Sequence, residues 1–209
     1  MASHHAQFQD GAAQHFGDAP GELAATQNAT VLCDLSQFGI LKVSGEDAQG
    51  FLQNLLSSDV KAVTPAQAQL SSFNTAKGRM LATFLIWQTG ADYYLHLPRS
   101  LCAHMQKKLS MYVLRAKVKI TDASDDIICL GVAGNNAASL IEASFSSVPE
   151  KAMSAAQHNH GSVIRLGDNR FQINTTLQYA PVIWQKLSAD ARTVGSPCWN
   201  WLNIRAGIP

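Results

Sequence analysis

Residues 80–97 have the sequence MLATFLIWQTGADYYLHL, and this stretch decides the fold. The run from Met80 to Trp87 is almost uninterrupted in its apolar character and predicts a strand. The turn residues 89–92 return the chain into a second strand at 93–97. Pro98 suits the start of a helix, and apolar residues follow it at helical spacing. The stretch therefore predicts a hairpin followed by a helix.

The second half of the chain repeats this order of elements. Residues 127–132 predict a strand, a helix follows residues 134–136, and residues 162–166 and 171–175 predict a hairpin before a helix near Pro181. In the first half, residues 39–43 predict the corresponding strand, and residues 44–47 (SGED) predict a capping box that opens a helix. When the two halves are aligned so that residues 107–109 match residues 185–187, the hairpins that precede these residues also align. The duplication predicts an α+β fold of two ferredoxin-like lobes, each an antiparallel sheet with packed helices.

The domain organisation follows from this repeat. Residues 1–29 contain no Lys or Arg and little periodic hydrophobicity, so we expect a poorly ordered lead-in. Residues 30–121 form the first predicted α+β lobe, and residues 122–209 form the second. The second lobe is expected to end in an aromatic helix that carries Trp199 and Trp201.

Composition excludes several classes of protein. An apolar fraction of 46% and a charged fraction of 15% exclude intrinsic disorder, and a net charge of +1 gives no bulk electrostatic case for a nucleic-acid or membrane partner. Four scattered cysteines indicate reduced thiols rather than a disulfide or zinc framework. No signal peptide and no spanning apolar stretch of ~20 residues is evident. We therefore expect a cytoplasmic protein.

Two basic regions stand out as candidate binding sites. Residues 74–79 (NTAKGR) place two cations around a glycine in a turn between apolar strands, where backbone N–H groups can approach an anion. Residues 99–119 carry six cations, and no carboxylate lies between Tyr93 and Thr121. That region suits a phosphate or a polyanionic tail. A solvated hairpin turn is the alternative for the first region, and surface lysines on a helix are the default interpretation of the second.

Three motifs in the same order resemble a known family. They are LCDLS at 32–36 with the Gly39–Gln53 pattern that follows, KGRMLA at 77–82, and IRAGIP at 204–209. Together they resemble the YgfZ branch of the folate-binding, glycine-cleavage T-protein-like (aminomethyltransferase-like) superfamily, over residues 30–209. The resemblance implies a two-lobed, T-protein-like folate-binding body around a central cavity. It also implies that the C-terminal β-barrel of the family is lacking here.

The resemblance implies a function and its partners. Family members bind tetrahydrofolate, assist iron–sulfur cluster assembly or repair, and affect tRNA-modifying enzymes. The expected partners are folate and iron–sulfur proteins or their assembly factors, with no direct nucleic acid, no membrane and no metal. Self-association through the truncated C-terminal face is also expected. The positions that match the family's folate site are Asn74, Lys77, Gly78, Arg79, Arg205 and Gly207.

Three departures from the family pattern bear on activity. The aspartate pair that supports aminomethyl transfer is replaced by Ala82 and Thr83, which cannot hold a proton at neutral pH. We therefore expect no catalytic residue and no aminomethyl transfer. Arg205 stands where the superfamily commonly has Glu, and the Lys-Gly-Cys-Tyr motif of the family is missing. A folate-dependent one-carbon transferase and a ligand-free interaction scaffold are the alternatives.

Overall fold

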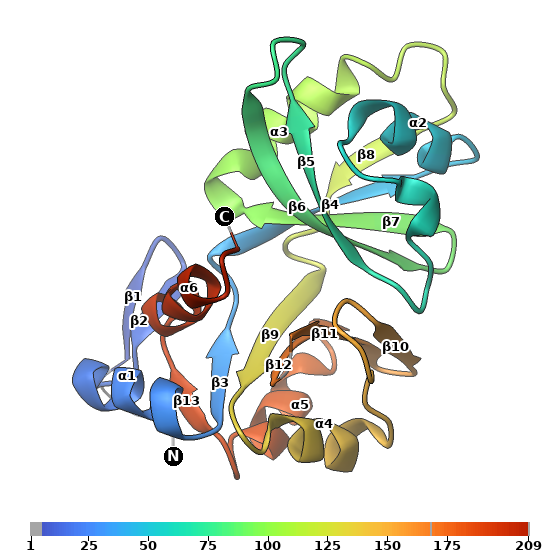
Figure 1. The fold of residues 1–209 in the computed structure, drawn as a ribbon. Helices are drawn as coiled ribbons and strands as arrows, with labels where there is room; N and C mark the ends of the chain where they lie inside the picture. The colour runs from blue at the N-terminus through green and yellow to red at the C-terminus, as the bar shows by residue number, and fades with distance from the viewer. Residues whose placement is uncertain (1–5, 168, 209) are drawn as a thin grey trace. The chain divides into compact units, whose positions relative to one another are not determined.

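The computed structural model describes residues 6–167 and 169–208, which fall into two compact units. Unit 1 is built from Met1–Gln37 together with Ile127–Pro209, and unit 2 is Phe38–Asp126. Both units combine an antiparallel sheet with helices (Figure 1). None of the helices in the described part of the chain is long and apolar enough to cross a membrane.

Unit 2 is a five-stranded antiparallel sheet with two α-helices on one face. The strands lie in the order β5-β6-β7-β4-β8. Its elements are β4 (Phe38–Ser44), α2 (Ala48–Leu55), the 3-10 turn η1 (Val60–Ala62), β5 (Gln69–Asn74), β6 (Met80–Thr89), β7 (Asp92–Pro98), α3 (Arg99–Ser110) and β8 (Lys119–Asp122). The hairpin and helix predicted for residues 80–110 are confirmed as β6, β7 and α3.

The core of unit 2 follows from the periodicity of these elements. Alternate residues of β7, such as Leu95 and Leu97, face the apolar stripes of α2 and α3, where Leu52 and Met105 are fully buried. The opposite face of the same sheet carries Trp87 and other side chains of the alternate set. Alternate residues of each strand therefore lie on opposite faces of the sheet. In each unit we call the face away from the two packed helices (α2 and α3 in unit 2) the second face.

Unit 1 contains a six-stranded sheet in the order β10-β11-β12-β9-β3-β13. Every pair is antiparallel except β3 with β13, which is parallel. Its elements are β1 (Gln7–Gln9), β2 (Ala12–His15), α1 (Ala19–Asn28), β3 (Val31–Asp34), β9 (Ile127–Ala133), α4 (Ala137–Phe145), β10 (Ala155–His158), β11 (Gly161–Gly167), β12 (Arg170–Thr176), α5 (Ala180–Leu187), β13 (Arg192–Val194) and α6 (Ser196–Arg205). Helices α4 and α5 pack on one face, against residues such as Phe171 and Ile173.

The two units share one topology, as the repeat predicts. The order β4-α2-β5-β6-β7-α3-β8 recurs as β9-α4-β10-β11-β12-α5-β13. The strand registers also correspond: Leu41 pairs with Leu95 in unit 2 as Leu130 pairs with Ile173 in unit 1. The sheets differ at one place, because β3 lies between β9 and β13, whereas β8 lies directly beside β4. Unit 1 is therefore the same sheet with one strand inserted.

The junction between the first strand and helix of each unit is built around a glycine. Gly45 and Gly134 have φ values of +118° and +119°. A Cβ at Gly45 would lie 2.0 Å from the carbonyl oxygen of Lys117, and one at Gly134 would lie 2.1 Å from that of Ala29. Both sites combine a backbone conformation that favours glycine with a carbonyl that leaves no room for a side chain.

The capping box predicted at residues 44–47 is wrong. Helix α2 begins after Asp47 and has no side-chain cap, because the turn at Gly45 leaves Ser44 within β4. The carboxylate of Asp47 instead accepts a hydrogen bond from the backbone N–H of Lys117, with an oxygen–nitrogen distance of 2.7 Å. It therefore fixes the start of α2 to the segment before β8.

The N-terminal segment differs from the lead-in predicted for residues 1–29. Residues 1–5 lie outside the described part, and residues 6–29 contain β1, β2 and α1. The side chain of Glu22 is buried, and its carboxylate accepts hydrogen bonds from the backbone N–H groups of Phe16 (2.6 Å) and Gly195 (2.9 Å). This buried acidic side chain helps to tie the segment to unit 1, which low periodicity does not reveal.

The unit boundaries also differ from the predicted boundary near residue 121. Strand β3 pairs with β9 and β13, so residues 30–37 belong to unit 1, and residues 122–126 belong to unit 2. Sequence-local patterns place residues 30–37 with the residues that follow them. Residues 30–37 belong to unit 1 because β3 pairs with strands far along the chain. Cys33, for example, lies opposite Gly131.

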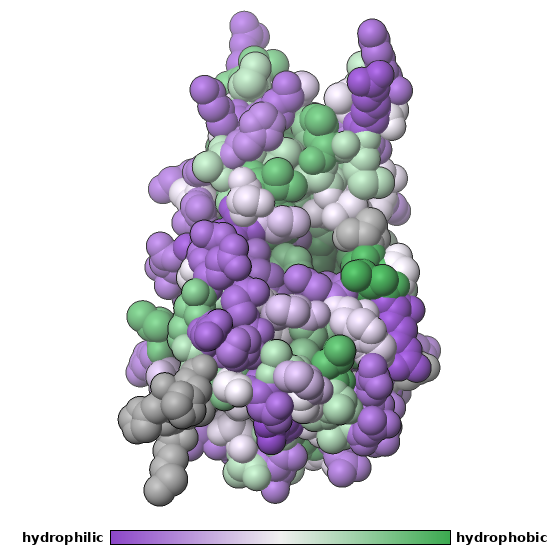
Figure 2. Space-filling view, turned by 90° about the vertical axis from the view of Figure 1, so that its left-hand side faces the viewer, coloured by the Kyte–Doolittle hydropathy of each residue, from purple (hydrophilic) through white to green (hydrophobic). Residues whose placement is uncertain are grey.

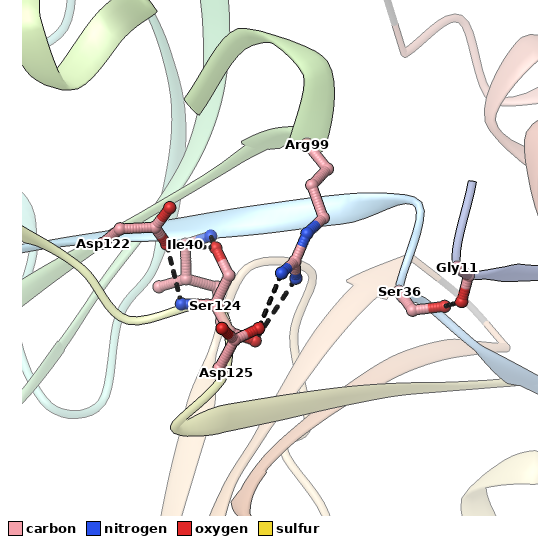
Figure 3. Close-up of polar contacts among 7 residues, drawn as sticks. All are labelled: Gly11, Ser36, Ile40, Arg99, Asp122, Ser124 and Asp125. Carbon is pink, nitrogen blue, oxygen red and sulfur yellow. Dashed lines mark hydrogen bonds and ion pairs between the residues drawn. The ribbon is translucent and has the colours of Figure 1, made fainter. Parts of the chain in front are cut away.

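Both segments where the chain passes between units are held by polar contacts within their own unit (Figure 3). In unit 1 the Ser36 hydroxyl lies 3.2 Å from the carbonyl oxygen of Gly11. In unit 2 the Ser124 hydroxyl donates to the carboxylate of Asp122 (2.5 Å) and accepts from the N–H of Ile40 (2.9 Å). Next to it, Asp125 pairs with Arg99 at 2.6 Å.

Candidate functional site

The basic turn predicted at residues 74–79 connects β5 to β6 and has a defined backbone. The N–H of Thr75 donates to the carbonyl of Arg79 (2.8 Å), and the N–H of Gly78 donates to the carbonyl of Thr75 (2.9 Å). Gly78 has a φ of +77°, which places it in the left-handed region. Asn74, at the end of β5, accepts a hydrogen bond from the Ser72 hydroxyl through its side-chain oxygen (3.2 Å).

The cations of this turn face solvent. Lys77 and Arg79 are exposed, and neither forms an ion pair with any residue that the structure describes. The turn projects from unit 2 in Figure 1, and the projections at the top of Figure 2 end in hydrophilic side chains. Two unpaired cations at a projecting turn can receive an anionic group from solution.

The two positions that replace the family's aspartates lie on opposite faces of β6. Ala82 belongs to the core of unit 2 and is 5% exposed. Thr83 is half-buried on the second face, where it pairs with Ser72 of β5. Neither side chain ionises at neutral pH, so this part of unit 2 offers no general acid or base.

Arg205 and Gly207 lie together at the C-terminal end of α6, in unit 1. The guanidinium of Arg205 stacks on the ring of Trp201, 5.3 Å from its centre. Gly207 has a φ of +66°, and its N–H donates to the carbonyl of Ile204 (3.1 Å). The N–H of Ile208 donates to the carbonyl of Asn203 (3.0 Å), which completes a Schellman cap. Gly207 therefore has a structural reason to be glycine that needs no ligand.

The predicted folate residues thus fall into two groups. Asn74, Lys77, Gly78 and Arg79 lie on one turn of unit 2. Arg205 and Gly207 lie on one helix end of unit 1. The meeting of the two groups around one ligand stays a prediction.

A row of polar side chains that the sequence analysis missed crosses the second face of the unit 1 sheet, opposite α4 and α5. The Gln172 side-chain nitrogen donates to the Asn174 side-chain oxygen at 2.7 Å, and the Asn174 nitrogen donates to the Ser162 hydroxyl at 3.2 Å. The Cys129 thiol donates to the same Asn174 oxygen at 3.2 Å. All four residues are buried. We call Cys129, Gln172, Asn174 and Ser162 the polar row.

One acceptor of the polar row has no partner among the described residues. The side-chain oxygen of Gln172 accepts no hydrogen bond from them, and the residue is buried, with 1% of its surface exposed. The equivalent positions of unit 2, by strand register, hold Tyr94, His96, Leu85 and Ile40. One sheet therefore presents amides where its duplicate presents aromatic and aliphatic side chains. Polar residues at alternate positions of FQINT (171–175) were the available signal in the sequence.

Two further polar side chains of unit 1 lie at the end of β3 and in the segment that follows it. Burial raises the pKa of the Asp34 carboxyl, which accepts hydrogen bonds from the Ser36 N–H and hydroxyl at 3.1 Å each. Both polar atoms of the Gln37 amide are buried and have no partner among the described residues. A buried amide without partners is costly, so this pair of donor and acceptor groups suits a polar guest.

Arg170 fixes the end of α6. Its guanidinium donates to the carbonyl of Leu202 and to the side-chain oxygen of Asn203, at 2.7 Å each, and lies 5.1 Å from the centre of the Trp199 ring. Burial lowers the pKa of Arg170 to about 10. The cation therefore satisfies carbonyl groups at the negative end of the helix dipole and holds Trp199 in place.

The cysteines have no environment for thiolate chemistry. All four are buried, and none forms a disulfide. Burial raises the pKa of the Cys33 and Cys129 thiols, and it raises the pKa of the Cys102 thiol to about 11. The expected reduced thiols are therefore thiol groups held in their protonated form. No group of His, Cys, Asp and Glu in the described residues could hold a metal ion.

The chain is similar to known proteins along most of its length. The model of the GCVT N-terminal domain family matches residues 4–198. The tRNA-modifying protein YgfZ of Klebsiella pneumoniae is 29% identical over 180 residues, which cover 85% of this chain and 55% of that protein. The YgfZ of Escherichia coli O157:H7 is 27% identical over 188 residues, which cover 89% and 57%. The chain thus spans about half the length of the curated relatives that it matches.

Solved structures share the fold. The glycine cleavage system aminomethyltransferase T of Bartonella henselae superposes with a TM-score of 0.79 at 16% identity, over 93% of this chain and 56% of that one. A chain of heterotetrameric sarcosine oxidase from Corynebacterium sp. U-96 superposes with a TM-score of 0.58 at 12% identity, over 81% and 89%. The fold of the described residues is therefore that of the T-protein, as the sequence resemblance implies.

Proposed function

The chain belongs to the GCVT N-terminal domain family, and from that membership we propose that it is a folate-binding accessory protein of tRNA modification. The proposal names tetrahydrofolate or a derivative as the ligand. It excludes aminomethyl transfer, because Ala82 is buried in the core of unit 2 and Thr83 does not ionise.

The observation that carries the proposal is the polar row of unit 1. A pterin ring has an edge of adjacent hydrogen-bond donors and acceptors, and carboxamides can pair with such an edge at two points, as they do with adenine. Gln172 is buried and its nitrogen already donates to Asn174, but its oxygen has no partner among the described residues, and Gln37 of the same unit has an amide without one. The residues present therefore fit a pterin in chemical kind.

The other end of a folate is a glutamate tail, which needs cations. Lys77 and Arg79 have no carboxylate partner among the described residues, and Arg205 has only the ring of Trp201. An arginine can hold a carboxylate through two parallel hydrogen bonds, whereas a lysine acts as a point charge. When bound, tetrahydrofolate would supply a carrier for one-carbon groups, and this chain's residues would hold and orient it.

The biological role follows the curated relatives, which carry the name tRNA-modifying protein. We propose that the chain acts in the cytoplasm on iron–sulfur proteins or their assembly factors, and so affects the enzymes that modify tRNA. It would do this through protein contact and without touching the tRNA itself. Ile204, on α6, is 77% exposed and is the residue through which self-association would occur.

Anaerobic titration calorimetry with tetrahydrofolate tests the proposal. Wild-type chain should bind more tightly than 1 mM, a free energy of about 4 kcal/mol. The Gln172→Leu variant keeps the volume but removes both the acceptor and the hydrogen bond to Asn174, and it should bind about tenfold more weakly. Ser58→Ala, a hydroxyl variant in unit 2 outside the proposed site, is the matched control and should bind as wild type does. Absence of binding to wild type would leave only a ligand-free scaffold.

A further inference from the structure

The segment between α3 and β8, residues 111–118, presents apolar side chains to solvent. Leu114 is 89% exposed, Met111 is 64% exposed and Tyr112 is 45% exposed. Leu114 also has a φ of +44°, in the left-handed region that leucine rarely adopts. A side chain that packs on almost nothing adds little to folding stability, and residues with a strained backbone cluster at functional sites such as ligand clamps.

The backbone of this segment is anchored to unit 2. Lys117 donates its N–H to the carboxylate of Asp47 at 2.7 Å, and its ammonium pairs with Glu46 at 2.7 Å. The carbonyl oxygen of Lys117 lies only 2.0 Å from the position that a Cβ on Gly45 would take. The N–H of Ala116 donates to the carbonyl of Val113 at 2.7 Å, within the segment. Leu114 is therefore held out from the surface by a defined backbone.

Unpaired cations lie close to these apolar side chains in the sequence. No carboxylate occurs in the sequence between Asp92 and Asp122. Two of the six cations in that stretch are neutralised, Arg99 by Asp125 and Lys117 by Glu46. The four that form no ion pair with a described residue are Lys107, Lys108, Arg115 and Lys119.

We propose that residues 107–119 bind the surface of an anionic lipid bilayer. Leu114 and Met111 enter the boundary of the acyl region, and Arg115 and Lys119 meet the phosphate groups of the lipids. This inference is independent of the folate proposal. The net charge of +1 gave no reason to expect a membrane partner. That value sums over the whole chain and does not describe the local excess of cations at residues 107–119.

Three considerations favour a bilayer over other anionic partners. A bilayer accepts a protruding apolar side chain without a matching pocket. The phosphates of a nucleic acid attract cations but offer nothing to the side chains of leucine and methionine. Lysine is depleted at protein–protein interfaces, whereas three of the four unpaired cations here are lysines.

Sedimentation of the 209-residue chain with vesicles tests the proposal. Binding to phosphatidylcholine vesicles that contain phosphatidylserine should be about tenfold stronger than binding to phosphatidylcholine alone. Leu114→Gly removes the side chain and suits the positive φ, so the variant should fold at least as well and bind about tenfold more weakly. Leu177→Ser, at a residue 65% exposed in unit 1, is the matched control and should bind as wild type does.

A charge variant separates the lipid proposal from simple attraction to polyanions. Arg115→Ala combined with Lys119→Ala should weaken binding to the anionic vesicles, while Lys151→Ala in unit 1 should not. If this pair abolishes binding but Leu114→Gly has no effect, the surface is only a polyanion site and the proposal is wrong. Equal binding to neutral and anionic vesicles, or no sedimentation with either, would also overturn it.

Discussion

Gly45 and Gly134 occupy the same point of the two units with the same backbone conformation. Their φ values, +118° and +119°, differ by a single degree, and each faces a carbonyl oxygen about 2 Å from the site of a Cβ. The duplication therefore reaches from the order of elements down to individual dihedral angles. It has preserved, at equivalent positions, two residues whose replacement the packing cannot accept.

Alanine at either position should destabilise the chain strongly. The positive φ alone costs about 1–2 kcal/mol for a residue with a Cβ, and the contact with the carbonyl adds to it. We expect Gly45→Ala and Gly134→Ala to lower the free energy of unfolding by at least about 3 kcal/mol, measured by urea denaturation. Gly90→Ala is the matched control, because Gly90 has a φ of +62° but nothing within 4 Å of its Cβ position. A loss at Gly90 as large as at Gly45 would contradict the role of the carbonyl.

His96 should make the chain less stable in mild acid. Burial lowers the pKa of His96 to about 3, from an ordinary value near 6.5, so the folded chain keeps this ring neutral while the unfolded chain takes up a proton. The stability from His96 is complete above pH 6.5 and is lost as the pH falls toward 3, by about 1.4 kcal/mol per pH unit.

The His96→Phe variant isolates this effect. It keeps the ring contact with Phe38, whose centre lies 4.5 Å away, and removes the titrating group. Urea denaturation at pH 8 measures the change in packing alone, and denaturation at pH 5 adds the cost of protonation. Wild type should lose about 2 kcal/mol more than the variant between these two values. Equal losses would show that His96 does not remain neutral in the folded chain.

Glu22 should contribute more to stability than its place in a weakly patterned segment suggests. Both of its carboxylate oxygens accept backbone N–H groups, so Glu22→Gln turns an amide NH₂ toward a donor and leaves it unpaired. We expect a loss of about 1–3 kcal/mol in the free energy of unfolding. The exposed Glu46→Gln variant, which breaks a surface pair with Lys117, should lose less than about 1 kcal/mol. A reversed order would contradict the anchoring role of Glu22.

Arg79 should distinguish folates by the length of their glutamate tails. If the basic turn holds the tail, Arg79→Ala should weaken polyglutamate binding by about ten- to a hundredfold, and added salt should weaken wild-type binding to polyglutamates more steeply than binding to the monoglutamate. Lys61→Ala, at an exposed lysine elsewhere in unit 2, is the control for loss of charge. Equal binding of both ligands by wild type and Arg79→Ala at low salt would show that the turn is only a solvated hairpin.

Local patterns were sufficient to predict the repeated elements of the two units, but not β1, β2 and α1 in residues 6–29. The apolar run of residues 80–87 and its turn correspond to β6 and β7, and the repeat of strand, helix, hairpin and helix is present in both units. The place of β3 could not be predicted in this way. Its partners β9 and β13 follow the whole of unit 2 in the sequence, and no local spacing records such a pairing.

The candidate site shows the same division. The turn at residues 74–79 was predictable, because a glycine between cations after a strand is a local feature. The polar row was not, because alternating polar residues in a strand ordinarily indicate a solvated face. Here the ring of Trp199 lies against Gly131 on that face and the row is buried. Only the packing of α6 distinguishes a buried amide row from an exposed strand surface.

The insertion of β3 between β9 and β13 sets an order of events during synthesis. Unit 2 is continuous in the chain, so all of its strands have been synthesised before the first residue of β9 is made. Strand β3, by contrast, must wait for both of its neighbours, which are made after unit 2 is complete. Unit 2 can therefore fold while unit 1 still exposes an unpaired N-terminal strand, and that waiting strand is where a nascent chain would be open to mispairing or to a chaperone.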